Sequence, residues 1–90
     1  MLIVYKYPVP PDDAFDLDLP VGARILTFQT QRDDACLWCL VDPKAPTETR
    51  RFRLAGTGHA IDIPPERLVY VATVQFHGGA LVFHLFEVVP

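Results

Sequence analysis

Short apolar runs alternate with turn-forming residues along the whole chain, and the runs have the period of two that is typical of β-strands. The clearest run is Phe15-Asp16-Leu17-Asp18-Leu19, in which apolar and acidic residues alternate strictly, so one face is expected to be buried. The other runs are rich in β-branched and aromatic residues. The expected strands cover residues 1–7, 15–19, 24–31, 35–41, 47–55, 68–76 and 80–89.

The segments between these runs have the chemistry of turns. Residues 20–23 contain Pro and Gly and are expected to turn the chain within a meander, while the polar residues 31–34 predict a hairpin. The sequence His77-Gly78-Gly79 predicts a second, tight hairpin, because glycine tolerates positive φ angles. Residues 64–67 are expected to form one helical turn within the longest connection.

Together these elements predict an all-β fold without a long amphipathic helix. We expect a small single-domain sandwich or barrel over residues 1–90, with about seven mostly antiparallel strands and at most one short helical turn. In strand 24–31, Leu26 and Phe28 should share one face. Strand 35–41 is apolar on both faces, which indicates a central strand or a face that meets a partner.

Composition limits the partners that this domain can have. Half of the 90 residues are apolar, which is a large share for so small a core, so we expect self-association into a homo-oligomer. The net charge of −3 argues against binding duplex nucleic acid, which needs a broad basic face. No segment has the length of a membrane span or the pattern of a signal peptide, so the expected location is the cytoplasm.

Nothing in the chain predicts an enzyme. Serine is absent, which excludes serine catalysis, and the acidic residues have no nucleophile beside them. Cys36 and Cys39 have the spacing of a zinc or redox pair, but residues three apart on a strand face opposite sides. We therefore predict no catalytic residue, no metal and no cofactor, and two reduced thiols.

Hydrogen-bond donors at three places predict a binding site for a small anion. Arg50 shares a strand face with apolar residues, so it should either pair with a carboxylate or point into a pocket. In the loop after that strand, Thr57, Gly58 and His59 could hold an anionic group with backbone and side-chain donors. The turn of His77, Gly78 and Gly79 could join them if it lies at the same end of the sheet.

Two neighbouring arginines are interpreted differently. Arg51 and Arg53 alternate with apolar residues on the other side of their strand. Such arginines can clamp a phosphate, but a solvated strand face is the simpler interpretation of this pair.

Several separated motifs resemble those of a family of short phage and prophage proteins that is known only as a domain of unknown function. The resemblance covers essentially the whole chain and is carried by residues 5–8, 36–42, 48–52, 56–59 and 73–87, which read YKYP, CLWCLVD, ETRRF, GTGH and TVQFHGGALVFHLFE. It implies a gene of a mobile element that is expressed in the cytoplasm of a bacterial host. It supplies no catalytic residue.

With this resemblance, the leading functional hypothesis is an accessory protein that acts by binding. An oligomeric sponge that sequesters a phosphate-bearing host signalling nucleotide would need tight capture and no catalysis. The alternative is an inhibitor or adaptor that binds a host protein through an acidic or aromatic surface, such as residues 12–18 and Trp38. A minor virion or assembly component is the third hypothesis.

Overall fold

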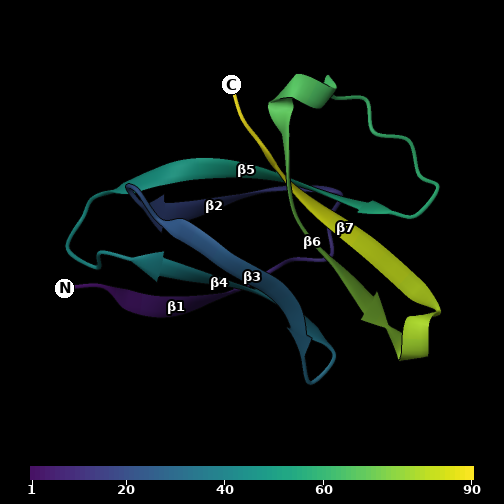
Figure 1. The fold of residues 1–90 in the computed structure, drawn as a ribbon, viewed down its shortest axis with the longest axis horizontal. Coiled ribbons are helices and arrows are strands. Elements are labelled where there is room, and N and C mark those ends of the chain that lie inside the picture. The colour runs from purple at the N-terminus through teal and green to yellow at the C-terminus, as the bar shows by residue number, and fades with distance from the viewer.

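Two antiparallel β-sheets pack face to face in the computed structural model, which describes residues 1–90 (Figure 1). One sheet has the strand order β1-β4-β3 and the other has the order β2-β5-β7-β6. The all-β fold predicted from the sequence is therefore confirmed, and of the two predicted architectures, sandwich and barrel, the structure has the sandwich. The elements are β1 (Ile3–Pro8), β2 (Ala14–Pro20), β3 (Arg24–Gln31), β4 (Asp34–Val41), β5 (Thr47–Gly56), the 3-10 turn η1 (Pro65–Arg67), β6 (Leu68–Phe76), the 3-10 turn η2 (His77–Gly79) and β7 (Leu81–Val88).

Strand pairing departs from the expected meander. The hairpins β3–β4 and β6–β7 form between chain neighbours, as the turn residues predict. Strand β2, however, pairs with β5, and the turn at residues 20–23 carries the chain from one sheet to the other. Figure 1 shows β2 alongside β5 and β1 alongside β4. Local alternation predicts which face of β2 is buried, but not which strand it pairs with.

A β-bulge in β3 corrects the expectation for Leu26. The register with β4 shifts between Ile25 and Thr27, so one extra residue is inserted into the strand. Beyond the bulge the alternation of faces is reversed relative to a regular strand. Phe28 is buried as expected and Ile25 packs against the core, whereas Leu26 is 47% exposed.

The core is filled from the inner faces of both sheets. Phe15 of β2 stacks on Phe52 of β5, with ring centroids 5.3 Å apart. Strand β4 is the middle strand of its sheet, which is the first of the two alternatives that its apolar residues on both faces indicate. Its Cys39 is in the core, where burial raises the pKa of the thiol to about 11, and Cys36 is on the opposite face.

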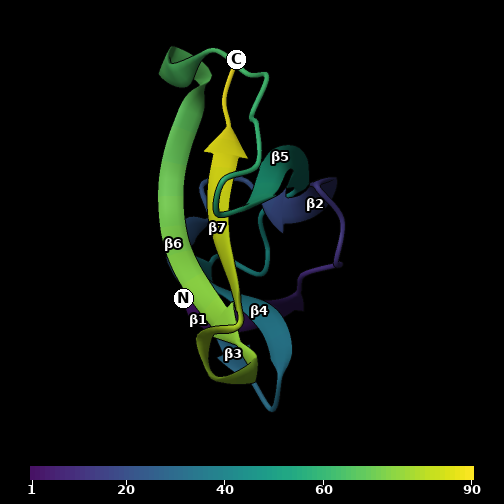
Figure 2. The ribbon, with the colours of Figure 1, turned by 90° about the vertical axis from the view of Figure 1, so that its right-hand side faces the viewer.

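The β6–β7 hairpin closes through η2, a second helical turn beyond the one expected. Its two glycines adopt positive φ angles, 66° at Gly78 and 97° at Gly79, as the hairpin prediction requires. His77 also has a positive φ of 50°, which is uncommon for a residue with a side chain. Figure 2 shows this turn next to the β3–β4 hairpin, at one end of the sandwich. None of the helical segments could span a lipid bilayer.

Candidate functional site

Arg50 projects from the inner face of β5 and is held by Glu87 of β7. Its Nε donates to Oε2 of Glu87 at 2.6 Å and its Nη2 to Oε1 at 2.8 Å, while Nη1 donates to the Ala23 carbonyl at 2.6 Å. The two side chains are only 18% and 15% exposed. The hydrogen bonds with Glu87 raise the pKa of Arg50 although burial opposes this. Of the two alternatives for Arg50, the structure therefore has the carboxylate partner.

The loop after β5 has the turn that its glycines predict. The backbone N–H of His59 donates to the Gly56 carbonyl at 3.1 Å, and Gly58 has a φ of 86°. The Thr57 hydroxyl is 2.8 Å from Nε2 of His84, a half-buried residue on the outer face of β7. Thr57 and His59 share a small pocket of about 200 Å³ with the start of β7.

His77, in the turn of the β6–β7 hairpin, lines a larger pocket at the end of the sandwich. We call this the end pocket; its volume is about 390 Å³. Four aspartates from the β1–β2 connection and the β3–β4 hairpin line it together with His77. These carboxylates repel an anion, so His77 faces the wrong electrostatic environment for a phosphate.

The structure does not bring the expected site residues together. Arg50 borders a pocket of about 590 Å³ beside the C-terminus, His59 the small pocket and His77 the end pocket. None of the five main pockets contains two of these three residues. Gly58, Gly78 and Gly79 line none of them and serve the turns.

Three other arginines do gather, on the outer face of the four-stranded sheet. Arg51 and Arg53 point outward from β5, because they alternate with the buried Phe52. Arg67, at the end of η1, joins them around a pocket of about 340 Å³, which we call the arginine pocket. Asp16 is its only acidic residue, so the side chains contribute three positive charges and one negative charge. The other lining residues are Ala14, Phe15, Phe52, Ile63 and Val88.

Arg53 has poorly satisfied donors at this pocket. Its Nη2 donates to the Ala60 carbonyl at 3.4 Å, and its Nη1 is 3.7 Å from a carboxylate oxygen of Asp62. Its Nε is buried and has no hydrogen-bond acceptor. Leaving a buried donor unsatisfied costs about 1–3 kcal/mol, and more when it is charged. An acidic ligand in the arginine pocket would supply acceptors for this guanidinium.

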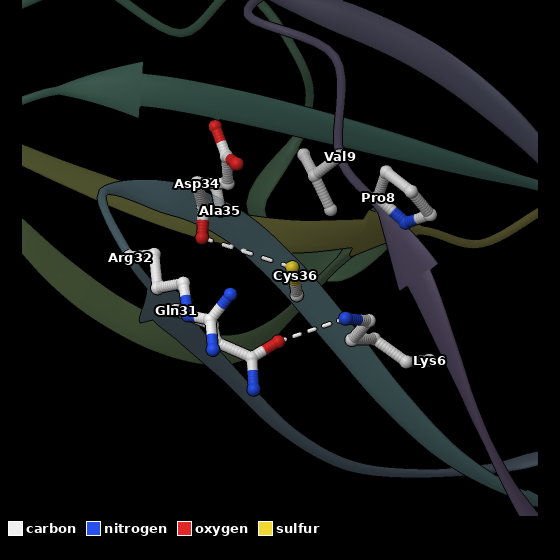
Figure 3. A pocket seen from close by; sticks show the side chains of 8 residues that line it. All are labelled: Lys6, Pro8, Val9, Gln31, Arg32, Asp34, Ala35 and Cys36. Atoms are coloured by element: carbon white, nitrogen blue, oxygen red, sulfur yellow. Dashed lines mark hydrogen bonds between the residues drawn. The ribbon is translucent and has the colours of Figure 1, made fainter.

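A further pocket lies on the outer side of the three-stranded sheet, near the β3–β4 hairpin (Figure 3). Lys6 donates from Nζ to Oε1 of Gln31 at 2.8 Å across its mouth. Figure 3 shows Arg32 beside Gln31 and the Asp34 carboxylate turned away from both. This hairpin pocket shares Asp34 with the end pocket, whereas Asp12, Asp13 and Asp33 line the end pocket and not this one.

A family model matches the chain over residues 1–90. The chain belongs to the family described as Domain of unknown function (DUF7352). No curated protein matches it, and no solved structure does either. Membership in DUF7352 assigns no site residue, so the function has to be argued from the geometry of the sites.

Sequence reasoning missed the arginine pocket in this DUF7352 chain for a specific reason. The i, i+2 spacing of Arg51 and Arg53 correctly predicts one shared face, and the interpretation of that face as solvated holds for Arg51 only. Arg53 is covered in part by the loop at residues 57–64, whose Ala60 and Asp62 contact it. No local pattern indicates that this loop returns Arg67 to the same place.

Proposed function

We propose that the protein acts by binding a small anionic ligand, of the phosphate-bearing class, in the arginine pocket. The observation that carries this proposal is the convergence of Arg51, Arg53 and Arg67 on one pocket whose lining contains one carboxylate, although Asp62 also lies 3.7 Å from Arg53. Guanidinium groups bind phosphate oxygens in a bidentate manner, and they stay charged at any physiological pH. This site replaces the expected one, in which Arg50 would have been the main cation.

The dimensions and lining of the pocket support a small ligand. Its volume of about 340 Å³ lies at the lower end of the range typical of ligand sites. Ile63 and Val88 line it as well, so a ligand with an apolar or aromatic part next to its phosphate has surface to contact. A mononucleotide has both features.

Capture without catalysis fits a sequestering role. In this proposal the protein is a phage-type accessory protein in the cytoplasm of a bacterial host, where it removes a signalling nucleotide of the host's defence by stoichiometric binding. Such a sponge requires affinity and copy number, and no catalytic group. The resemblance to phage proteins motivates this role, and the arginine pocket supplies the chemistry that it requires.

Isothermal titration calorimetry with inorganic phosphate, adenosine 5′-monophosphate and a cyclic dinucleotide tests the proposal. We expect at least one nucleotide to bind, and an Arg51→Ala/Arg53→Ala variant to weaken that binding about tenfold or more, because charge-assisted hydrogen bonds contribute roughly 1.5–3 kcal/mol each. Lys44→Ala is the matched control, since it removes one exposed cation that lines none of the main pockets.

The single variant Arg51→Ala keeps the test valid if the double variant fails to fold, because Arg51 is exposed and makes no ion pair. If none of the three probes binds, or if the arginine variants bind as tightly as the Lys44→Ala control, the arginine pocket is not the site.

A further inference from the structure

The end pocket combines an apolar floor with an acidic rim. Its floor is formed by four core or partly buried side chains and by the exposed Leu81, and its rim belongs to three connections: β1–β2, β3–β4 and β6–β7. The floor residues are Val9, Leu54, Phe76, Leu81 and Phe83, and the rim carboxylates are Asp12, Asp13, Asp33 and Asp34. The volume of about 390 Å³ is sufficient for one large apolar side chain and its neighbours.

None of the four rim carboxylates forms an ion pair. The protein has two ion pairs, Arg50–Glu87 and Arg53–Asp62, and neither involves a rim carboxylate. The pocket lining contains no lysine or arginine. Arg32 and Lys6 line the hairpin pocket, which shares Asp34 with the end pocket, and Figure 3 shows the Asp34 carboxylate turned away from Arg32. Three rim carboxylates, Asp12, Asp13 and Asp33, therefore line no pocket that contains a lysine or arginine, and they lie beside an apolar opening together with Asp34.

The two hairpin turns at this pocket contain positive φ angles. The chain has three non-glycine residues with positive φ, namely Arg32 at 51°, Asp33 at 67° and His77 at 50°. All three belong to the two turns that border the end pocket. At Arg32 and Asp33 the positive φ angles are those that a two-residue hairpin loop requires between the paired Gln31 and Asp34, whereas the angle at His77 is uncommon for a residue with a side chain. Here they hold Asp33 and His77 at the pocket.

We propose that the end pocket binds a segment of a partner protein that presents a large apolar side chain flanked by lysine or arginine. The floor would bury the apolar side chain, and the rim would attract the flanking cations and repel acidic segments. A bare metal ion is a poorer occupant, because no three His, Cys, Asp or Glu side chains gather closely enough to hold one. This binding is independent of the arginine pocket and of its anionic ligand.

Fluorescence anisotropy with labelled short peptides tests the charge and the apolar requirement separately. The probes have the cores Lys-Leu-Lys, Glu-Leu-Glu and Lys-Ser-Lys. We expect only the Lys-Leu-Lys peptide to bind well, with an affinity that falls between about 0.1 M and 1 M salt, where the Debye length shrinks from about 10 Å to about 3 Å.

Two variants and a matched control assign the binding to this pocket. Asp33→Asn/Asp34→Asn should weaken binding of the Lys-Leu-Lys peptide about tenfold and flatten its salt dependence, and asparagine tolerates the positive φ at residue 33. Leu81→Ser removes a 47% exposed floor residue, so it should weaken binding without changing the salt dependence. Glu66→Gln, an exposed carboxylate in η1, is the control and should change nothing.

The proposal is overturned by equal binding of the Lys-Leu-Lys and Glu-Leu-Glu peptides, or by rim variants that behave like Glu66→Gln. No binding of the Lys-Leu-Lys peptide at about 1 mM would overturn it as well, since affinity at that level corresponds to only about 4 kcal/mol. Phosphate titrations on the same rim variants report separately on the arginine pocket, so failure at one site is distinguished from failure at the other.

Discussion

The Arg50–Glu87 pair lies at the inner edge of the sandwich and links β5, β7 and the residue that precedes β3. Replacing Arg50 by methionine keeps much of the side-chain volume but removes three hydrogen bonds, two to Glu87 and one to the Ala23 carbonyl. The Glu87 carboxylate, 15% exposed, then has no cation within ion-pair distance. Glu87→Gln is the milder change, because an amide can still accept from Arg50.

The burial of the pair determines the expected loss of stability. Removing one partner of a fully buried ion pair costs about 3–5 kcal/mol, and exposed pairs contribute about 0–1 kcal/mol. Because Arg50 and Glu87 are 18% and 15% exposed, the loss lies nearer the buried case after allowance for solvent screening. We expect Arg50→Met to lower the free energy of unfolding by about 2–3 kcal/mol, which corresponds to a drop in Tm of roughly 10–20 °C for a domain of this size.

Urea denaturation followed by the fluorescence of Trp38, the single tryptophan, measures this loss. In a double-mutant cycle, Arg50→Met/Glu87→Leu should be more stable than the sum of the two single losses predicts, because neither charge then remains unpaired. Strict additivity, or a loss below about 0.5 kcal/mol for Arg50→Met, would refute the reasoning. An Arg50 variant that keeps its stability and loses nucleotide binding would restore Arg50 as a ligand residue.

Three further predictions concern other parts of the molecule. Burial raises the pKa of the Cys39 thiol from 9.0 to about 11, so with rising pH this thiol ionises in the unfolded chain before it ionises in the folded protein. The free energy of unfolding should therefore fall by about 2–3 kcal/mol between pH 9 and pH 11. Urea titrations of a Cys39→Ala variant should lack this part of the loss in stability. Asp62→Asn should tighten phosphate binding in calorimetry, since it removes a carboxylate 3.7 Å from Arg53, and an unchanged affinity would count against the arginine pocket. Self-association stays a prediction, and we expect it at the edge strand β1, where residues 1–5 are exposed and apolar. Analytical ultracentrifugation should show an oligomer that the Val4→Lys variant no longer forms. A monomeric parent protein would contradict this expectation.

Much of the fold could be predicted because it depends on neighbours in the sequence. The acidic and apolar alternation of residues 15–19 predicts the buried face of β2, and the turn residues of 31–34 and 77–79 predict two hairpins that the structure contains. The bulge at Leu26 could not be predicted, because it requires the register with β4. The partner of β2 could not be predicted either, since sequence separation says nothing about which strand edges meet.

The sequence by itself therefore determined the strands, most of their buried faces and an arginine on an apolar face that had either to pair with a carboxylate or to point into a pocket. Only the tertiary structure decided that this partner is Glu87, 37 residues away, and that Arg67 joins Arg51 and Arg53 instead. The physical reason is the separation along the chain over which each effect acts. Alternation and turn chemistry act between residues that are close in sequence, whereas the grouping of charges depends on strand order and on loops that return across a sheet. The same strand order separates His77 from the arginines and places it among carboxylates.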